Sequence, residues 1–316
     1  MPLPVHSPSG VPPRVTVLLA THNGERWLGE QLDSILSQEG VELRVVALDD
    51  ASTDSTPSLL AQRAAEDPRL TVLPTQGPSG SAAANFYRLI LTLPENNGDL
   101  IAFADQDDIW MPNKLQRHAA ILVAGAHDGI SSDVVAFSDD GSQSLVRKSY
   151  PQRRFDYLFE SPGPGCTFLL TPRLAELVRQ RLAENTSLAS AADFHDWLIY
   201  VLCRARGWSW HIDSIPSLHY RQHDSNAMGA NVGARQALSR LSLIRQRWHR
   251  HQATTLARVA LEVAPTDKRE EIAGILNNLV GQSIGRRFSL LRTAGQFRRR
   301  PRDRAIITVL IALGIW

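Results

Sequence analysis

The sequence contains only two cysteines, Cys166 and Cys203, among 316 residues. Two thiols cannot build a disulfide framework, and without a Cys-x-x-Cys pair they cannot by themselves supply the four ligands of a structural zinc site. So little cysteine is typical of proteins in a reducing compartment, and we expect a cytoplasmic protein.

Long hydrophobic runs are also missing. The longest apolar segment, residues 305–316, has 12 residues, whereas a transmembrane helix needs about 20. This segment either lies on a membrane surface or packs within the protein. Residues 1–13 hold five prolines and no apolar stretch of signal-peptide length, so the sequence predicts a disordered N-terminal segment over residues 1–13 rather than a secretion signal.

The glycine-rich phosphate-binding motifs of two common enzyme classes are absent. No G-x-G-x-x-G follows the first apolar run, and no G-x-x-x-x-G-K-[ST] occurs in the chain. These absences count against a dinucleotide-binding dehydrogenase and against a P-loop enzyme. A diphosphate ligand would therefore have to be held by a metal and by side chains.

The net charge is only +2, but the charges are unevenly distributed. Residues 1–233 contain 18 Lys and Arg against 27 Asp and Glu, a net charge of −9. Residues 234–316 contain 16 against 5, a net charge of +11. We therefore predict an acidic globular domain at residues 14–233 and a basic helical extension at residues 234–316, which we expect to seek anionic surfaces.

Short apolar runs alternate with helical patterns in the acidic domain. Strands are predicted at residues 14–20, 43–48, 70–73, 100–104, 134–137, 166–171 and 208–212, and a helix at residues 194–205. The alternation predicts an α/β fold with a mostly parallel central sheet flanked by helices. Ligands of such sheets bind at the carboxyl ends of the strands, where polar clusters follow at residues 21–23, 49–50 and 105–108.

The sequence Asp105-Gln106-Asp107-Asp108 follows the fourth predicted strand. Three carboxylates within four residues repel one another, so a bound cation would stabilise them. Mg²⁺ and Mn²⁺ prefer oxygen ligands and often bind one or two carboxylates together with phosphate oxygens. The alternative is a solvated acidic turn before a helix, since Pro112 suits a helix start.

A second polar cluster, residues 49–54, follows the second predicted strand. The carboxylate of Asp49 can accept hydrogen bonds from the base or the ribose of a nucleotide. Capping of the next helix by Ser52 or Asp54 is the alternative, and it accounts for one of these residues rather than for the whole cluster.

Two later segments carry further candidates. Asp196 is either a general base beside an aromatic side chain or an acid placed at the positive N-terminus of a helix. Arg221 and His223 offer a cation for phosphate and an imidazole for a metal or a phosphate, although a single loop histidine is usually solvated.

In chain order, these segments resemble family 2 glycosyltransferases, which have the GT-A fold and use nucleotide sugars. The bacterial rhamnosyltransferase-like members that build cell-surface polysaccharides are the most similar. The resemblance spans about residues 15–231. It rests on VTVLLATHNGERWLGEQLDSILSQ (15–38), LDDASTDST (48–56), NFYRLI (85–90), FADQDDIWMPNKL (103–115), GCTFLL (165–170), HDWLIY (195–200) and YRQHDSN (220–226).

The resemblance implies nucleotide-binding roles for residues at the strand ends. Thr21 and Asn23 would line the nucleotide pocket, Asp49 would contact the base and Asp105 would lie near the ribose. The family's common Asp-Asp-Gly-Ser is Asp-Asp-Ala-Ser here, and Ala51 in place of glycine argues against a left-handed turn at that point.

The resemblance also implies catalytic and metal-binding roles. Asp107 would be the metal ligand of the family's Asp-x-Asp element, and His223 would lie at the metal or the diphosphate, with Arg221 beside it. Asp196 would be the catalytic base, although the family's frequent Glu-Asp pair is His195-Asp196 here.

The implied reaction is an inverting, metal-assisted sugar transfer. Asp196 would remove a proton from the acceptor hydroxyl, and Mg²⁺ or Mn²⁺ would offset charge on the departing nucleoside diphosphate. The resemblance suggests dTDP-rhamnose as the donor, with UDP sugars as alternatives, and a cell-surface glycan or lipid-linked acceptor. A sugar-phosphate nucleotidyltransferase and a non-catalytic, membrane-associated nucleotide-binding scaffold are the alternative functions.

The basic extension carries the clusters Arg286-Arg287 and Arg298-Arg299-Arg300 near its apolar end. They favour peripheral attachment to anionic lipid at the inner face of the plasma membrane. Packing on the acidic domain and a homo-oligomer contact are the alternatives. We do not expect nucleic-acid binding, because the extension lacks an interleaved aromatic pattern.

Overall fold

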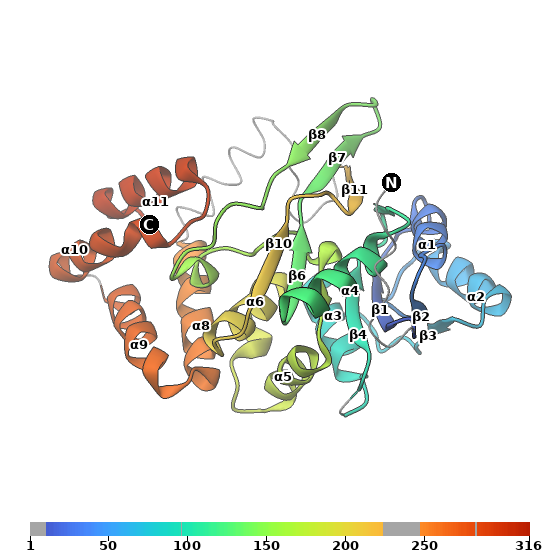
Figure 1. The fold of residues 1–316 in the computed structure, drawn as a ribbon, viewed down its shortest axis with the longest axis horizontal. Helices are drawn as coiled ribbons and strands as arrows, with labels where there is room; N and C mark the ends of the chain where they lie inside the picture. The colour runs from blue at the N-terminus through green and yellow to red at the C-terminus, as the bar shows by residue number, and fades with distance from the viewer. Residues whose placement is uncertain (1–10, 96, 224–246, 282) are drawn as a thin grey trace. The chain divides into compact units, whose positions relative to one another are not determined.

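The computed structural model describes residues 11–95, 97–223, 247–281 and 283–316 (Figure 1). These residues form two compact units. Unit 1 contains the described residues up to 148 together with 163–183 and 209–223, and unit 2 contains 149–162, 184–208 and the described residues from 247 onward. Residues 1–10 of the predicted N-terminal segment and the predicted boundary near Gly233 lie outside the described residues.

Unit 1 is built on a sheet with the strand order β10-β6-β9-β4-β1-β2-β3 (Figure 1). Its strands are β1 (Arg14–Thr21), β2 (Glu42–Asp49), β3 (Leu70–Val72), β4 (Leu100–Ala104), β6 (Gly129–Ser132), β9 (Leu169–Leu170) and β10 (Trp210–Asp213). Most neighbouring strands are parallel, and β9 is antiparallel to both β4 and β6. The predicted α/β fold with a mostly parallel sheet is therefore confirmed.

Helices cover both faces of this sheet. They are α1 (Leu28–Leu36), α2 (Thr56–Glu66), α3 (Ala82–Leu91), α4 (Lys114–Gly125) and α5 (Pro172–Ala183). Side chains alternate along β1, so Val17 packs in the core cluster with Leu28 and Leu32 of α1, while α3 contacts β1 from the other face. The apolar spacing i, i+4 in α1 is what buries that helix against the sheet.

The strand register brings the polar clusters to one edge. Thr21 at the end of β1 pairs with Asp49 at the end of β2, and Leu19 pairs with Ala104 at the end of β4. Parallel strands that end in register place the loops that follow them side by side. The candidate residues after β1, β2 and β4 therefore share one edge of the sheet.

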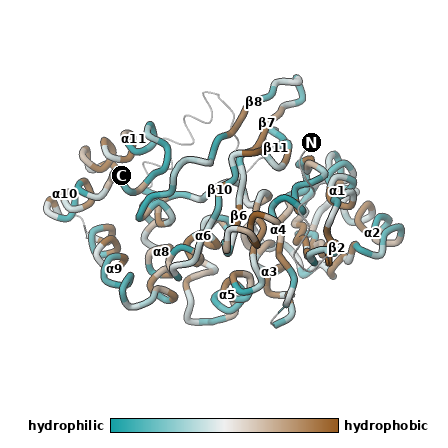
Figure 2. The backbone as a smooth tube through the Cα atoms, in the orientation of Figure 1, coloured by the Kyte–Doolittle hydropathy of each residue, from teal (hydrophilic) through white to brown (hydrophobic). Residues whose placement is uncertain are grey.

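A smaller sheet in unit 1 has the order β5-β11-β7-β8. Its strands are β5 (Ile109–Trp110), β7 (Val134–Ser138, apolar and brown in Figure 2), β8 (Gln143–Val146) and β11 (Leu218–Gln222).

The single strand predicted over residues 166–171 is wrong, because a 3-10 turn, η2 (Gly165–Thr167), precedes the two-residue β9. Main-chain bonds from Thr167 N to Pro164 O and from Phe168 N to Gly165 O close this turn after the Gly/Pro-rich loop.

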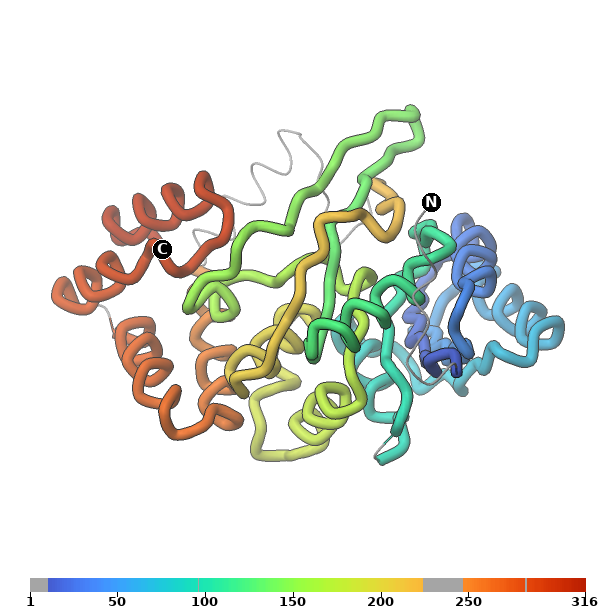
Figure 3. Tube along the Cα trace, viewed as in Figure 1, coloured from blue at the N-terminus to red at the C-terminus, as the bar shows by residue number. Residues whose placement is uncertain are grey.

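The described part of unit 2 is helical. It contains η1 (Asp156–Leu158), η3 (Ala189–Ala191), α6 (His195–Ala205), α8 (Trp248–Val263), α9 (Thr266–Val280), α10 (Ile284–Thr293), η4 (Ala294–Gln296) and α11 (Pro301–Leu313). The last four of these helices and turns follow in chain order from orange to red in Figure 3. No helix among the described residues has the length and apolarity needed to cross a membrane.

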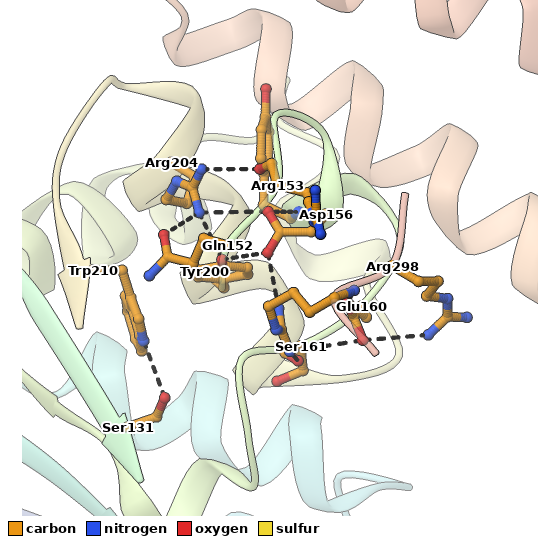
Figure 4. Close-up of polar contacts among 12 residues, drawn as sticks. Ser131, Gln152, Arg153, Asp156, Glu160, Ser161, Tyr200, Arg204, Trp210 and Arg298 are labelled. Atoms are coloured by element: carbon orange, nitrogen blue, oxygen red, sulfur yellow. Dashed lines mark hydrogen bonds and ion pairs between the residues drawn. The ribbon is translucent and has the colours of Figure 1, made fainter. Parts of the chain in front are cut away.

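A buried carboxylate, Asp156, lies at the centre of a hydrogen-bond network in unit 2 (Figure 4). Asp156 is fully buried, and its side chain accepts hydrogen bonds from Tyr200 Oη at 3.0 Å, from Arg299 Nη1 at 3.1 Å and from Arg204 Nη1 at 3.4 Å. Arg298 and Arg299 also lie within ion-pair distance of Glu160. Two arginines of the cluster 298–300 therefore form ion pairs within this unit, with acids of residues 149–162.

Candidate functional site

Hydrogen bonds join the three strand-end loops of unit 1. His22 N donates to Gln106 Oε1 at 2.7 Å, and Gln106 Nε2 donates back to His22 O at 2.9 Å. Asn23 N donates to Ser52 Oγ at 2.8 Å, and Asn23 Oδ1 accepts from Thr53 N at 2.8 Å. Because each loop is tied to its neighbour, the polar side chains at this edge are held in fixed relative positions.

The Asp49 carboxylate accepts three hydrogen bonds from its neighbours. Its Oδ1 accepts from Thr21 Oγ1 at 3.0 Å and from Ser52 Oγ at 2.5 Å, and its Oδ2 accepts from Ser52 N at 2.9 Å. Ala51 has a φ of 58°, so the expectation that alanine prevents a left-handed turn here is wrong. The strain of about 1–2 kcal/mol for an L-residue in this region is offset by the bonds that close the turn.

Asp50 and Asn85 lie beside this turn. Asp50 accepts hydrogen bonds from Ser79 N at 2.6 Å and from Ser79 Oγ at 2.7 Å, and Asn85 Nδ2 donates to Leu48 O at 3.0 Å. These contacts fix the end of β2 and the segment before α3.

Asp107 and His223 meet directly. His223 Nε2 lies 2.7 Å from Asp107 Oδ2, and the imidazole stacks on Trp27 with 4.1 Å between the ring centroids. Arg221 Nε donates to Asp107 O at 2.9 Å, and its Nη2 forms an ion pair with Glu30. The loop after β11 is thus brought to the acidic loop after β4, 116 residues away in sequence.

Asp108 is a buried acid next to this pair. It is fully buried, its Oδ1 accepts from Arg221 N at 3.2 Å, and its Oδ2 has no hydrogen-bond partner among the described residues. Burial, followed by the charges of Asp107 and Asp105, raises the pKa of Asp108 well above its ordinary value. Burial also raises the pKa of the Cys166 thiol, so that group stays protonated at neutral pH.

Lys114 is a residue that the sequence reasoning missed. It is 1% exposed, its Nζ lies 3.1 Å from the centre of the Trp110 ring, and burial lowers its pKa to about 7. Both residues belong to the motif FADQDDIWMPNKL, so the motif itself was the available signal, although it gives no indication that the lysine points inward.

The acidic cluster provides ligands suited to a hard cation. Ligand atoms of Asp105, Asp108 and Cys166 lie within 4.8 Å of one another, and Asp107 follows in the same loop. Carboxylate oxygens suit Mg²⁺ and Mn²⁺, whereas a protonated thiol does not. The carboxylates of Asp105 and Asp107 in this oxygen-rich loop therefore fit a divalent cation held chiefly by aspartates.

The predicted residues fall into two groups. The structure brings Thr21, Asn23, Asp49, Asp105, Asp107, Arg221 and His223 to the strand-end region of unit 1. Asp196 belongs to unit 2, where it lies in the first turn of α6 and its Oδ1 accepts from Trp197 N at 2.7 Å. The catalytic role of Asp196 stays a prediction.

The fold is shared with solved enzymes of the GT-A class. TarS from S. aureus (residues 1–349, solved in complex with UDP) superposes with a TM-score of 0.56 at 13% identity over 96% of this chain and 88% of that one. The mannosyltransferase PcManGT from Pyrobaculum calidifontis, solved with GDP-Man and Mn²⁺, gives a TM-score of 0.51 at 17% identity over 96% and 85%. At these identities the likeness establishes the GT-A fold alone.

Sequence similarity establishes the family. The profile of glycosyl transferase family 2 matches residues 16–174. The dTDP-rhamnosyl transferase RfbG of Shigella flexneri is 34% identical over 299 residues, 94% of this chain and 100% of that protein. The β-1,3-glucosyltransferase WfgD of Escherichia coli is 26% identical over 161 residues, 50% of this chain and 60% of that protein. The chain therefore belongs to glycosyl transferase family 2 and is a glycosyltransferase that uses a nucleotide-sugar donor.

Proposed function

We propose that this enzyme transfers rhamnose from dTDP-rhamnose, with inversion, to a hydroxyl of a cell-surface glycan or a lipid-linked acceptor. The observation that supports this choice of donor is the 34% identity to a dTDP-rhamnosyl transferase over 94% of the chain. The similarity covers the whole of that protein and nearly all of this chain, rather than a single shared segment.

The strand-end residues of unit 1 are the proposed donor site. Thr21, Asn23 and Asp49 would line the nucleoside pocket, and Asp105 would lie near the ribose. These side chains are already held by hydrogen bonds between the loops, so little ordering would be needed when the donor binds.

The diphosphate end of the donor would face Asp107, His223 and Arg221. We propose that Asp107, with Asp105 and His223 close by, holds Mg²⁺ or Mn²⁺, which when bound supplies positive charge for the departing diphosphate. Arg221 adds a fixed cation, because its guanidinium is held by Asp107 O and Glu30. Asp196 is the proposed general base for the acceptor hydroxyl.

A panel of nucleotide sugars tests the donor. Purified enzyme would be incubated with dTDP-rhamnose, UDP-glucose, UDP-GlcNAc and GDP-mannose, each with Mg²⁺ or Mn²⁺, and the released nucleoside diphosphate would be measured. We expect release from dTDP-rhamnose at least tenfold above that from the other donors. A faster reaction with a UDP or GDP sugar would overturn the donor assignment and leave the family assignment intact.

We also propose that the end of unit 2 makes peripheral contact with an anionic membrane. Ile284 and Phe288 on α10 are 68% and 60% exposed, and Val309 and Leu313 on α11 are 55% and 64% exposed (α11 in Figure 2). The 284/288 and 309/313 spacings place each pair on one face of its helix. Exposed arginines lie nearby in sequence at positions 286, 300 and 302, and they would attract anionic headgroups.

Co-sedimentation with vesicles of phosphatidylcholine and phosphatidylglycerol tests this contact. Phe288→Ser should reduce the bound fraction, whereas Val123→Ser on α4, where the wild-type side chain is 64% exposed, should not. Equal binding by the two variants would overturn the proposed surface, and so would a stable dimer that Phe288→Ser dissociates, because the apolar face would then belong to a second copy.

A further inference from the structure

Three arginines line a cavity in unit 2. Arg247, at the start of α8, Arg250, within α8, and Arg287, on α10, surround a volume of about 60 Å³. One water needs about 10–15 Å³ on this scale, so the cavity has room for a tetrahedral oxyanion. The transfer reaction proposed above assigns no role to any of these residues.

Arg250 is fixed by main-chain carbonyls. Its Nε donates to Leu279 O at 2.8 Å, its Nη2 to Gly281 O at 2.7 Å and its Nη1 to Trp316 O at 3.1 Å. Burial, followed by the charges of Arg247 and Arg287, lowers the pKa of Arg250. The three positive charges are therefore close enough to repel one another.

The Arg287 guanidinium lies against Gly314 at the cavity wall. Gly314 has a φ of 72°, and a Cβ built on it would lie 2.7 Å from Arg287 Cζ. The guanidinium thus lies directly against the main chain at Gly314, and a side chain at that position would force the guanidinium to shift.

The cavity arginines, of which Arg247 is exposed and Arg250 and Arg287 are half-buried, differ from three other arginines of unit 2 that have acidic partners. Arg204 and Arg299 pair with Asp156, and Arg298 pairs with Glu160. Across the described residues, no Asp or Glu side chain forms an ion pair with Arg247, Arg250 or Arg287. A terminal carboxylate on Trp316 would offset one of the three charges and leave two.

The start of α10 adds to the positive potential. Ser283 lines the cavity and is the N-cap of α10, where its Oγ accepts from Arg286 N at 3.4 Å. Helix N-termini carry free N–H groups and about half a positive charge. Guanidinium groups, a serine hydroxyl and a helix N-terminus together are the donors that proteins use for phosphate.

We propose that this cavity binds a phosphate group, either of a lipid headgroup or of a soluble phosphate compound. The phosphate would supply the negative charge that the three arginines lack and would accept hydrogen bonds from Arg247, Arg287 and Ser283. This site shares no residue with the donor site proposed in unit 1. The proposal therefore does not depend on which sugar the enzyme transfers.

Charge-matched variants test the proposal. Arg287→Gln and Arg247→Gln each remove one guanidinium from the cavity, and Arg292→Gln on α10 and Arg258→Gln on α8 remove the same charge at exposed positions outside it. Arg250 is not substituted, because its side chain makes three hydrogen bonds to main-chain oxygens. Removing it would disturb the fold as well as the cavity. Thermal denaturation of each variant confirms that the fold is retained.

Two probes distinguish the sources of phosphate. Inorganic phosphate would be titrated calorimetrically, and vesicles of phosphatidylcholine with and without phosphatidic acid would be used for co-sedimentation. We expect the cavity variants to weaken binding of at least one probe by tenfold or more relative to their controls, because a charge-assisted hydrogen bond is lost.

Each outcome decides the question. A loss confined to phosphatidic acid vesicles supports a lipid headgroup, a loss confined to inorganic phosphate supports a soluble ligand, and a loss with both supports a site that accepts either. If the cavity variants and their controls bind both probes equally well, the proposal is overturned.

Discussion

Asp108 in unit 1 and Asp156 in unit 2 are both fully buried carboxyl groups, yet their surroundings differ. Asp156 accepts hydrogen bonds from a tyrosine and two arginines. Asp108 accepts one main-chain N–H, and its Oδ2 has no partner among the described residues. A buried carboxyl group can stay charged when arginines pair with it, whereas burial without such partners favours its neutral, protonated form.

The different hydrogen-bond partners indicate that Asp156 has a structural role, whereas the acids around Asp108 belong to a candidate ligand site. Unit 2 neutralises Asp156 with its own arginines, so that acid has no need of a ligand. The acidic loop of unit 1 places Asp105, Asp107 and Asp108 together with less internal compensation, and that is where a cation and a diphosphate would be bound.

The sharpest test of this contrast lies within unit 2, between Asp196 and Asp156. Asp196→Asn should lower the transfer rate by about 10²–10⁴-fold, the usual contribution of a general base. The free energy of unfolding should stay nearly unchanged, because an amide oxygen can still accept the bond from Trp197 N. Initial rates with dTDP-rhamnose and dTDP affinity would be measured together. Near-normal turnover of this variant would remove Asp196 from the mechanism.

The same substitution should affect the stability of the protein very differently at the two buried acids. Asp156→Asn should lower the free energy of unfolding by about 3–5 kcal/mol, because Arg299 and Arg204 lose their charged partner in a buried site. Asp108→Asn should change it by less than about 1 kcal/mol, because a carboxyl with a raised pKa is already close to a neutral amide. Urea unfolding at pH 7 measures both values. Equal destabilisation by the two substitutions would contradict the comparison.

A buried histidine in unit 1 should make the stability of the protein depend on pH. His118 on α4 is fully buried, both ring nitrogens are without partners in the part of the chain that the structure describes, and burial lowers its pKa to about 3. The unfolded chain takes up a proton below about pH 6.5, whereas the folded state does not. Stability from this group is therefore complete above pH 6.5 and is lost as the pH falls toward 3.

His118→Leu should weaken that pH dependence, by up to about 1.4 kcal/mol per pH unit between pH 6 and pH 4. Urea unfolding of the wild type and the variant at several pH values measures the two slopes. Identical slopes would show that His118 is not kept neutral by the fold.

Much of the fold could be predicted from the sequence. The apolar runs near residues 14–20, 43–48 and 100–104 are strands because apolar, β-branched segments of that length fit a buried parallel sheet. Their register then placed the polar clusters at one edge. The conformation of Ala51 was not predictable from its residue type, because the hydrogen bonds around Asp49 override its intrinsic preference.

Contacts between distant segments were also beyond sequence reasoning. The stacking of Trp27 on His223 joins two loops, and the Asp156–Arg299 pair joins residues 143 positions apart. Periodicity and capping signals report only local structure, so neither pairing leaves a sequence pattern. The motifs named candidate residues, and the tertiary fold determined which of them meet.

The most direct test of the central claim is the affinity of the strand-end site for dTDP in the presence of Mg²⁺. Calorimetric titration of dTDP would compare the wild type with Asp107→Asn and with Asp140→Asn, an exposed acid of unit 1 outside the strand-end loops. The account predicts that Asp107→Asn weakens dTDP binding at least tenfold while Asp140→Asn binds like the wild type. Equal dTDP affinity for the Asp107→Asn variant and the wild type would contradict it.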